Sequence, residues 1–143
     1  MDIKLLTPTA TIPTKGSLAA AGYDLYADET VVIPAGETRL VHTGIALAIP
    51  AHFWGGIYAR SGLAAKRGLR PANCVGVIDA DYRGEIMVAM HNDSHEVQLI
   101  SHGDRIAQFV LAPVCEDPRG FEVVDELDST DRGEGGFGST GTN

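Results

Sequence analysis

Short apolar stretches alternate with turn residues along most of the chain. Many of these stretches are rich in β-branched residues, and turn residues interrupt them at roughly regular intervals of about eight to twelve positions. They cover residues 31–33, 40–41, 45–49, 53–58, 75–78, 86–90, 97–100, 106–111 and 121–124. Such spacing predicts an all-β fold, either a sandwich or a barrel.

One short helix is expected within this β pattern. Ser61 has the side chain of an N-cap, because its hydroxyl can accept a hydrogen bond from a free backbone N–H group at the start of a helix. Residues 63–67 form the expected body of the helix. Gly68 follows as the expected C-terminal stop, since glycine adopts the left-handed conformation at low cost.

The composition changes near Ser129. The chain has 143 residues, 17 of them glycine, and this length suits a single domain. After Ser129, glycine dominates and Phe137 is the only large apolar residue, so this segment cannot bury enough surface to offset its ordering entropy. We therefore expect a β domain over residues 1–128 and a flexible glycine-rich C-terminal arm over residues 129–143.

The charge balance narrows the set of partners. Eleven Lys and Arg residues against 19 Asp and Glu residues give a net charge of −8, which argues against sequence-independent binding to nucleic acid. A small anionic ligand held by local groups remains compatible with this charge. Because no apolar run has the length of a membrane span and the N-terminus lacks secretion features, we expect a cytoplasmic protein without a membrane partner.

The cysteines and histidines suggest structural roles. Cys74 and Cys115 form no CxxC pair, and we interpret both as core thiols of a protein in a reducing compartment. His91 and His95 have helical spacing, but the Asn-Asp-Ser between them is typical of a turn. A zinc site at these histidines is therefore the weaker interpretation.

Residues 60–62 are the first candidate for binding an anion. Arg60, Ser61 and Gly62 place a guanidinium, a hydroxyl and an unhindered backbone amide at the start of the expected helix. Free N–H groups and the helix dipole favour an anion there, which suits a phosphate. Taken alone, the stretch is more simply explained by an ordinary capped helix with an exposed arginine.

A second candidate lies in residues 73–87, which predict a β-hairpin with a tight acidic turn. Asp79 and Asp81 are good turn formers and need no further explanation. However, Ile78 and Tyr82 flank them and would partly desolvate a carboxylate. A carboxylate in that setting can orient and deprotonate a water molecule.

Two further stretches place charged groups among apolar neighbours. Asp24 lies between Tyr23 and Leu25, where a turn residue is the simpler interpretation. Asp104 and Arg105 open an expected strand, where a structural ion pair is the simpler interpretation.

The C-terminal arm combines groups that suit a nucleotide. Arg132 can bind a phosphate with two parallel hydrogen bonds, and Phe137 offers a face for stacking. Ser139 and Thr140 add hydroxyl groups. A merely flexible terminus is the alternative interpretation.

Taken together, five ordered motifs resemble those of the trimeric deoxyuridine triphosphatases, the dUTPase family. The motifs are residues 21–25 (Ala-Gly-Tyr-Asp-Leu), 60–64 (Arg-Ser-Gly-Leu-Ala), 76–84 (Gly-Val-Ile-Asp-Ala-Asp-Tyr-Arg-Gly), 103–108 (Gly-Asp-Arg-Ile-Ala-Gln) and 132–139 (Arg-Gly-Glu-Gly-Gly-Phe-Gly-Ser). The resemblance covers nearly the whole chain. Any one of these motifs alone would be weak evidence.

The resemblance implies a jelly-roll-like β fold that assembles as a homotrimer with three active sites at subunit interfaces. It implies hydrolysis of dUTP to dUMP and pyrophosphate with Mg²⁺ as cofactor. This reaction keeps uracil out of DNA and supplies dUMP for thymidylate synthesis.

The resemblance also implies roles for individual residues. Asp79 would position and partly deprotonate a water for in-line attack on the α-phosphorus, and Asp24 would anchor magnesium through water. Uracil and deoxyribose would contact Asn73, Val77, Ile78, Tyr82 and Met87. The phosphates would contact Arg60, Ser61, Gly62 and Gln108. The arm of another subunit would close over the nucleotide with Arg132, Phe137, Gly138 and Ser139.

Two residues depart from the family pattern, and two alternative functions stay open. Glu134 stands where many relatives carry serine, and Ala59 stands where proline is common. These departures bear on how strongly the arm closes and not on the reaction, because neither removes a catalytic group. The first alternative is a dCTP deaminase of the same fold superfamily, although the sequence of residues 79–84 fits the hydrolase better. The second alternative is a catalytically silent nucleotide-binding module.

Overall fold

A computed structural model of the chain describes residues 1–73, 75–115 and 120–136. Within these ranges it contains eleven strands and one helix of seven residues. The elements in chain order are β1 (Asp2–Leu5), β2 (Tyr23–Tyr26), β3 (Val31–Ile33), β4 (Thr38–His42), β5 (Ile45–Ala48), β6 (Phe53–Tyr58), α1 (Ser61–Arg67), β7 (Leu69–Pro71), β8 (Gly76–Ile78), β9 (Met87–Asn92), β10 (Gln98–Ile100) and β11 (Arg105–Pro113).

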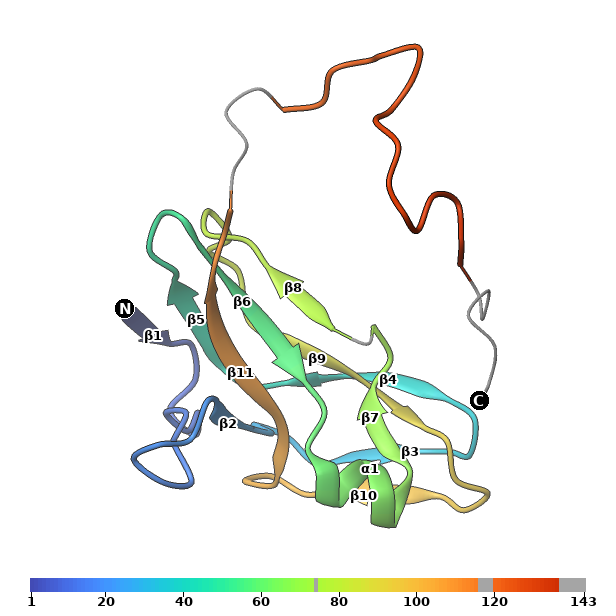
Figure 1. Cartoon of the computed structure of the whole chain (residues 1–143). Helices are drawn as coiled ribbons and strands as arrows, with labels where there is room; N and C mark the ends of the chain where they lie inside the picture. The colour runs from blue at the N-terminus through green and yellow to red at the C-terminus, as the bar shows by residue number, and fades with distance from the viewer. Residues whose placement is uncertain (74, 116–119, 137–143) are drawn as a thin grey trace.

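The strands pair only in antiparallel fashion among the described residues. One sheet has four strands in the order β2-β11-β6-β8, and another has three in the order β4-β9-β7 (Figure 1). Two further pairs join β1 to β5 and β3 to β10. The expected all-β sandwich with one short helix is therefore confirmed, and the described strands do not close into a barrel.

The sheets enclose a single apolar core. Leu25 and Phe109 enter it from the four-stranded sheet, and Val41, Val88 and Met90 enter it from the three-stranded sheet, all at most 1% exposed. Alternate residues of β9 point inward, as a strand with one buried face requires. Burying each such side chain stabilises the fold by about 1.5–3 kcal/mol relative to exposure.

The helix begins differently from the expectation. Arg60, in an extended conformation, is the N-cap residue, because its carbonyl accepts the first helical bond from Ala64 N–H. Ser61 is already the first helical residue, so the prediction of a Ser61 N-cap is wrong. The C-terminal stop is confirmed: Gly68 is left-handed, with a φ of 65°, and its N–H donates to the carbonyls of Ala64 and Leu63.

The strands on either side of the acidic turn belong to different sheets. β8 pairs with β6, so that Ile78 lies opposite Gly55, whereas β9 pairs with β4 and β7. The predicted β-hairpin over residues 73–87 is therefore wrong in its pairing. The apolar pattern identifies a strand and its buried face but does not name the strand's partner. Residues 79–86 instead connect the edge strand of the four-stranded sheet to the central strand of the three-stranded sheet.

Other differences concern short or exposed segments. Strands β1, β2 and β7 were not predicted, since a charged residue interrupts the apolar residues of each of them. Residues 121–124 form no strand; Phe121 and Val123 are fully exposed there. Cys115 is exposed and not a core thiol, because β11 has already ended at Pro113, and Cys74 lies outside the described residues.

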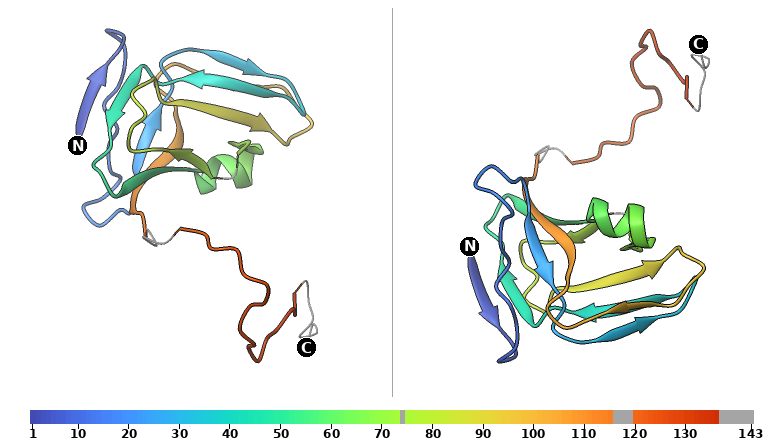
Figure 2. Two further views of the ribbon diagram at one scale, coloured as in Figure 1. Left: turned by 90° about the horizontal axis from the view of Figure 1, so that it is seen from above. Right: turned by 90° about the horizontal axis from the view of Figure 1, so that it is seen from below.

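Beyond β11, residues 120–136 run away from the sheets in both views of Figure 2. This segment carries none of the eleven strands of the described chain.

The turn between His91 and His95 is organised by Asn92. The Asn92 side chain is fully buried and donates from Nδ2 to the carbonyls of Ile33 and Glu96 at 2.9 and 2.7 Å. The turn chemistry expected there is thus confirmed. In the described ranges, no helix has the length and apolar character needed to cross a membrane.

Candidate functional site

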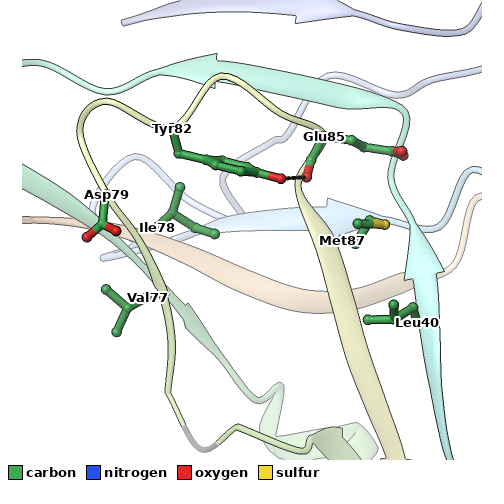
Figure 3. A pocket seen from close by; sticks show the side chains of 7 residues that line it. All are labelled: Leu40, Val77, Ile78, Asp79, Tyr82, Glu85 and Met87. Carbon is green, nitrogen blue, oxygen red and sulfur yellow. Dashed lines mark hydrogen bonds between the residues drawn. The ribbon is translucent and has the colours of Figure 1, made fainter.

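A cavity of about 210 Å³ opens beside the segment that connects β8 to β9. Figure 3 shows the side chains around it, which come from β4, from β8 with the following turn, and from the start of β9. They are Leu40, Val77, Ile78, Asp79, Tyr82, Glu85 and Met87. Five of these seven are residues that the sequence analysis placed in the site; Leu40 and Glu85 are additions.

Asp79 lies at the turn that follows β8. Tyr82 N–H donates to the carbonyl of Asp79 at 3.2 Å and closes the turn. The carboxylate is exposed, so the expected desolvation by Ile78 and Tyr82 is absent from the described chain.

The second group of polar residues gathers around Asp24 in β2. Its side chain is 6% exposed and lies between two arginines. Arg60 Nε donates to Oδ1 at 3.0 Å, and Arg105 Nη1 donates to Oδ2 at 3.2 Å. Arg60 Nη1 also donates to the carbonyl of Arg105 at 3.0 Å. Asp24 is thus a strand residue rather than a turn former, and Arg105 forms the structural ion pair that its sequence allowed.

Strand β11 brings this group together. Gln108 lies opposite Asp24 of β2 on one side and opposite Tyr58 of β6 on the other. Arg60, Ser61 and Gly62 follow directly after β6, at the same end of the sheet. Residues distant in the sequence therefore share one strand end because antiparallel pairing fixes their register.

A cavity of about 180 Å³ adjoins this end of the sheet. Its lining includes three arginines, Arg60, Arg67 and Arg105, together with Asp104. Arg67 reaches across from α1 and donates from Nε to the Gln98 side chain at 3.0 Å. The excess of guanidinium groups gives this cavity a positive charge that favours an anion.

The two cavities lie at opposite ends of β6. Since Ile78 pairs with Gly55, Asp79 comes one position further along, beside the start of β6, while Arg60 lies beyond the other end of the strand. Six residues of extended chain at about 3.3 Å each separate these positions, or roughly 20 Å. Figure 1 shows the same separation: α1 is at one end of β6 and the β8–β9 connection at the other.

A sequence model of the dUTPase family matches residues 8–141. Deoxyuridine 5'-triphosphate nucleotidohydrolase of Candida albicans is 48% identical over 143 residues, covering all of this chain and 89% of the relative. That of Syntrophotalea carbinolica is 50% identical over 143 residues, covering 99% and 96%. The chain belongs to the dUTPase family. The expectation of a dUTP-hydrolysing enzyme is thereby confirmed at the level of the family.

Solved dUTPase structures share the fold. A mutant of the Staphylococcus bacteriophage 80alpha dUTPase with dUpNHpp superimposes with a TM-score of 0.87 at 30% identity, covering 99% of this chain and 98% of that one. A mutant dUTPase from phage phi11 of S. aureus, described with a structural Mg(II) ion, gives 0.79 at 26% identity, covering 88% and 97%. The jelly-roll-like fold expected from the motifs is confirmed.

The remaining predicted residues of this dUTPase lie apart from the first cavity. Asn73 does not line it; its Nδ2 lies beside Gly76, where an added Cβ would come within 3.1 Å. Arg132 is exposed and donates from Nε to the carbonyl of Gly135 at 2.9 Å, forming a local turn. Phe137, Gly138 and Ser139 lie outside the described residues.

Asp24 can accept further hydrogen bonds. An ionised carboxylate offers about four lone-pair positions, and the two arginines occupy two of them. Within the described ranges no cluster of three acidic, histidine or cysteine side chains could hold a metal ion alone. The single Asp24 carboxylate fits Mg²⁺, because this ion commonly binds through only one or two carboxylates together with waters and substrate phosphates.

Leu40 and Glu85 could not be assigned to the site from the dUTPase motifs alone. Leu40 comes from a strand of the other sheet, and its sequence carries no chemical signal. Glu85 lies within the 73–87 stretch and directly follows Gly84, the last residue of a motif. That position was the signal that could have assigned it to the site.

Proposed function

We propose that this dUTPase hydrolyses dUTP to dUMP and pyrophosphate, with Asp79 orienting and partly deprotonating the water that attacks the α-phosphorus. The observation that carries the proposal is the 210 Å³ cavity, which gathers Asp79 with Val77, Ile78, Tyr82 and Met87. Apolar walls beside the exposed Asp79 carboxylate suit a nucleoside whose reacting phosphorus lies at the cavity mouth. The reaction keeps uracil out of DNA and supplies dUMP for thymidylate synthesis.

Uracil is selected by the backbone of β8. This strand lies at the edge of its sheet, so on the side away from β6 no described strand pairs with it. Its N–H and C=O groups can match the acceptor-donor-acceptor edge of uracil, whereas the amino group of cytosine would face another donor. The backbone near C5 of uracil leaves no space for the methyl group of thymine, and Tyr82 beneath the deoxyribose leaves no space for a 2′-hydroxyl. Asn73 and Met87 complete the contacts to the nucleoside.

The triphosphate binds at the arginine-rich end. The two described hydrogen bonds of Arg60 use two of the five N–H groups of its guanidinium, which leaves donors for phosphate oxygens. Ser61, Gly62 and Gln108 supply further donors. Asp24 would hold Mg²⁺ through water, and the bound ion would supply charge neutralisation for the triphosphate.

The active site is shared between copies of the chain. Attack on the α-phosphorus requires Asp79 and the phosphate-binding residues to meet around one triphosphate, but about 20 Å separates Asp79 from Arg60 within a chain. One copy therefore presents Asp79 and the nucleoside cavity to the arginines of another. The homotrimer implied by the motifs satisfies this requirement with three equivalent sites.

The arm completes the site from a further copy. In this proposal residues 129–143 close over the nucleotide, with Arg132 and Ser139 on phosphate, Phe137 on uracil and Gly138 allowing close approach of the backbone. Glu134 would add a negative charge beside the triphosphate and weaken closure. A cytoplasmic location stays a prediction.

Incubation of the purified protein with dUTP and Mg²⁺ tests the reaction. Pyrophosphate and dUMP are expected, and a chelator in excess should abolish their release. The same incubation with dCTP, assayed for ammonia, distinguishes the deaminase. Tight dUTP binding without pyrophosphate release would identify the silent module and overturn the proposal.

Subunit mixing tests the shared site. Asp79→Asn and Arg60→Ala trimers should each be inactive, but co-refolded mixtures should regain activity because some sites would combine an intact Asp79 with an intact Arg60. A mixture as inactive as its parents would place both residues in one chain's site. Light scattering showing about three chains per particle is the accompanying measurement.

A further inference from the structure

Residues 85 and 86 are tied to the turn between β4 and β5. Glu85 Oε1 accepts a hydrogen bond from Gly44 N–H at 2.8 Å, and Glu85 Oε2 lies 2.8 Å from His42 Nδ1. Ile86 N–H donates to the carbonyl of Ile45 at 2.8 Å, and the Thr43 hydroxyl donates to the carbonyl of Ile86. These bonds fix the end of the β8–β9 connection against the turn between β4 and β5.

The Tyr82 ring is fixed by the same short segment. Its hydroxyl donates to the backbone carbonyl of Glu85 at 3.0 Å, as Figure 3 shows. A Cβ added at Gly84 would come within 2.4 Å of the Tyr82 hydroxyl oxygen and 2.6 Å of Cζ. The ring therefore lies directly over the backbone of Gly84, in space that any other residue would fill. Gly84 and Glu85 together determine where the ring stands.

Tyr82 and Glu85 line the same cavity as Asp79 and Met87. We propose that Glu85, anchored by His42 and Gly44, is a positioning residue that holds the Tyr82 ring where it excludes ribonucleotides. This inference rests on the proposed function, in which Tyr82 lies beneath the deoxyribose. Glu85 acts through Tyr82 and contacts neither the reacting phosphorus nor the water.

The charges around His42 support the anchor. Besides Glu85, the acidic groups near the ring are Glu29, whose carboxylate accepts from His42 N–H at 2.8 Å, and Asp28. The hydrogen bond to Glu85 is the main reason that the pKa of His42 is raised. Burial acts to raise the pKa of Glu85, but the hydrogen bonds from His42 and Gly44 outweigh it and lower that pKa. Glu85 is thus an ionised acceptor for both partners.

The test compares kcat/KM for dUTP with kcat/KM for UTP in full-length variants. Glu85→Ala should reduce the preference for dUTP about tenfold, the size expected for losing hydrogen bonds to a charged group. Glu85→Gln retains an acceptor for Gly44 N–H and should restore part of the preference. Glu29→Gln is the matched control, because Glu29 contacts His42 N–H without lining the cavity; its preference should equal that of the wild type.

Coupling to Tyr82 provides the decisive readout. Tyr82→Phe removes the hydroxyl that donates to Glu85, so adding Glu85→Gln to it should lower the preference less than Glu85→Gln does alone. A lower melting temperature with an unchanged dUTP preference in both Glu85 variants would mean a merely structural role and overturn the inference. If Glu85→Ala does not fold, Glu85→Gln and the double variant decide. A wild type that does not hydrolyse dUTP would instead overturn the proposed function.

Discussion

The two ends of β6 are built on different principles. At one end, Asp24 is nearly buried between Arg60 and Arg105, and each contact is a direct bond between charged side chains. At the other end, Asp79 is exposed, and the cavity beside it has mainly apolar walls. The order at that end comes from neighbouring residues such as Glu85 rather than from contacts of the carboxylate.

This difference separates stability from turnover. A buried carboxylate between two guanidinium groups contributes to folding, because removing it leaves charges without a partner. An exposed carboxylate contributes little to folding and can be placed for chemistry alone. Substitutions at the arginine-rich end should therefore change melting temperature and activity together, whereas substitutions of Asp79 should change activity only.

The sharpest test of this contrast is Asp79→Asn. Losing a general base typically costs a factor of 10² to 10⁴, so kcat for dUTP should fall by about a thousandfold. Dissociation constants for dUTP and melting temperatures should stay near wild-type values, since the side chain is exposed. Asp81→Asn, on the same turn, is the control and should keep most of the turnover. Near-normal kcat in Asp79→Asn would require another base.

Removing residues 131–143 should have the next largest effect. Stacking of an aromatic ring on a base contributes roughly 1–3 kcal/mol, so turnover should fall between about fivefold and 150-fold. Circular dichroism and light scattering should show an unchanged folded assembly, because the core is complete without this segment. Full activity of the truncated protein would contradict the role of the arm as a lid.

Much of the fold and the site was predictable from the sequence. The regular spacing of short apolar stretches between turn residues identified most strands, because each strand contributes apolar side chains to the core. The motifs identified five of the seven residues that line the nucleoside cavity, since all five lie within the single continuous stretch of residues 73–87. Local chemistry also located the end of the helix, where Gly68 takes the left-handed conformation.

What failed depends on contacts between distant residues. Ser61 was a reasonable N-cap by its side chain, but Arg60 occupies that position and its guanidinium is bound to Asp24 instead. The apolar residues 121–124 resemble a strand, yet no neighbouring strand in the described chain pairs with them. Leu40 enters the cavity from the opposite sheet, and no local pattern could reveal that pairing.

Asp24→Asn tests the arginine-rich end directly. The substitution leaves two guanidinium groups sharing one neutral partner, and we expect it to destabilise the protein by about 2 kcal/mol, less than a fully buried pair because both arginines are partly exposed. Denaturant unfolding measures this change. Asp93→Asn, which breaks the surface pair with Arg70, is the control and should have a much smaller effect. If the two variants were equally stable, the contrast between a stabilising arginine-rich end of β6 and an exposed Asp79 end would be contradicted.

The smallest effect should come from pH, through His42 at the nucleoside end. Because its hydrogen bond to Glu85 raises the pKa of His42, the pair contributes fully below the ordinary histidine value of about 6.5 and loses its charge as pH rises through the raised value. The pKa of Glu85 is lowered, so at acid pH the pair loses its contribution to stability only as the pH falls through that lowered pKa.

His42→Gln should therefore lose more melting temperature at pH 6 than at pH 8.5, each measured against the wild type at the same pH. The difference should be only about 1–3 °C, since the His42 side chain is half exposed and solvent screens the pair. His95→Gln, on an exposed turn, provides the comparison for a general histidine effect. If His42→Gln lost the same amount at both pH values, the proton on His42 would contribute nothing to anchoring Glu85, and the neutral hydrogen bond would suffice.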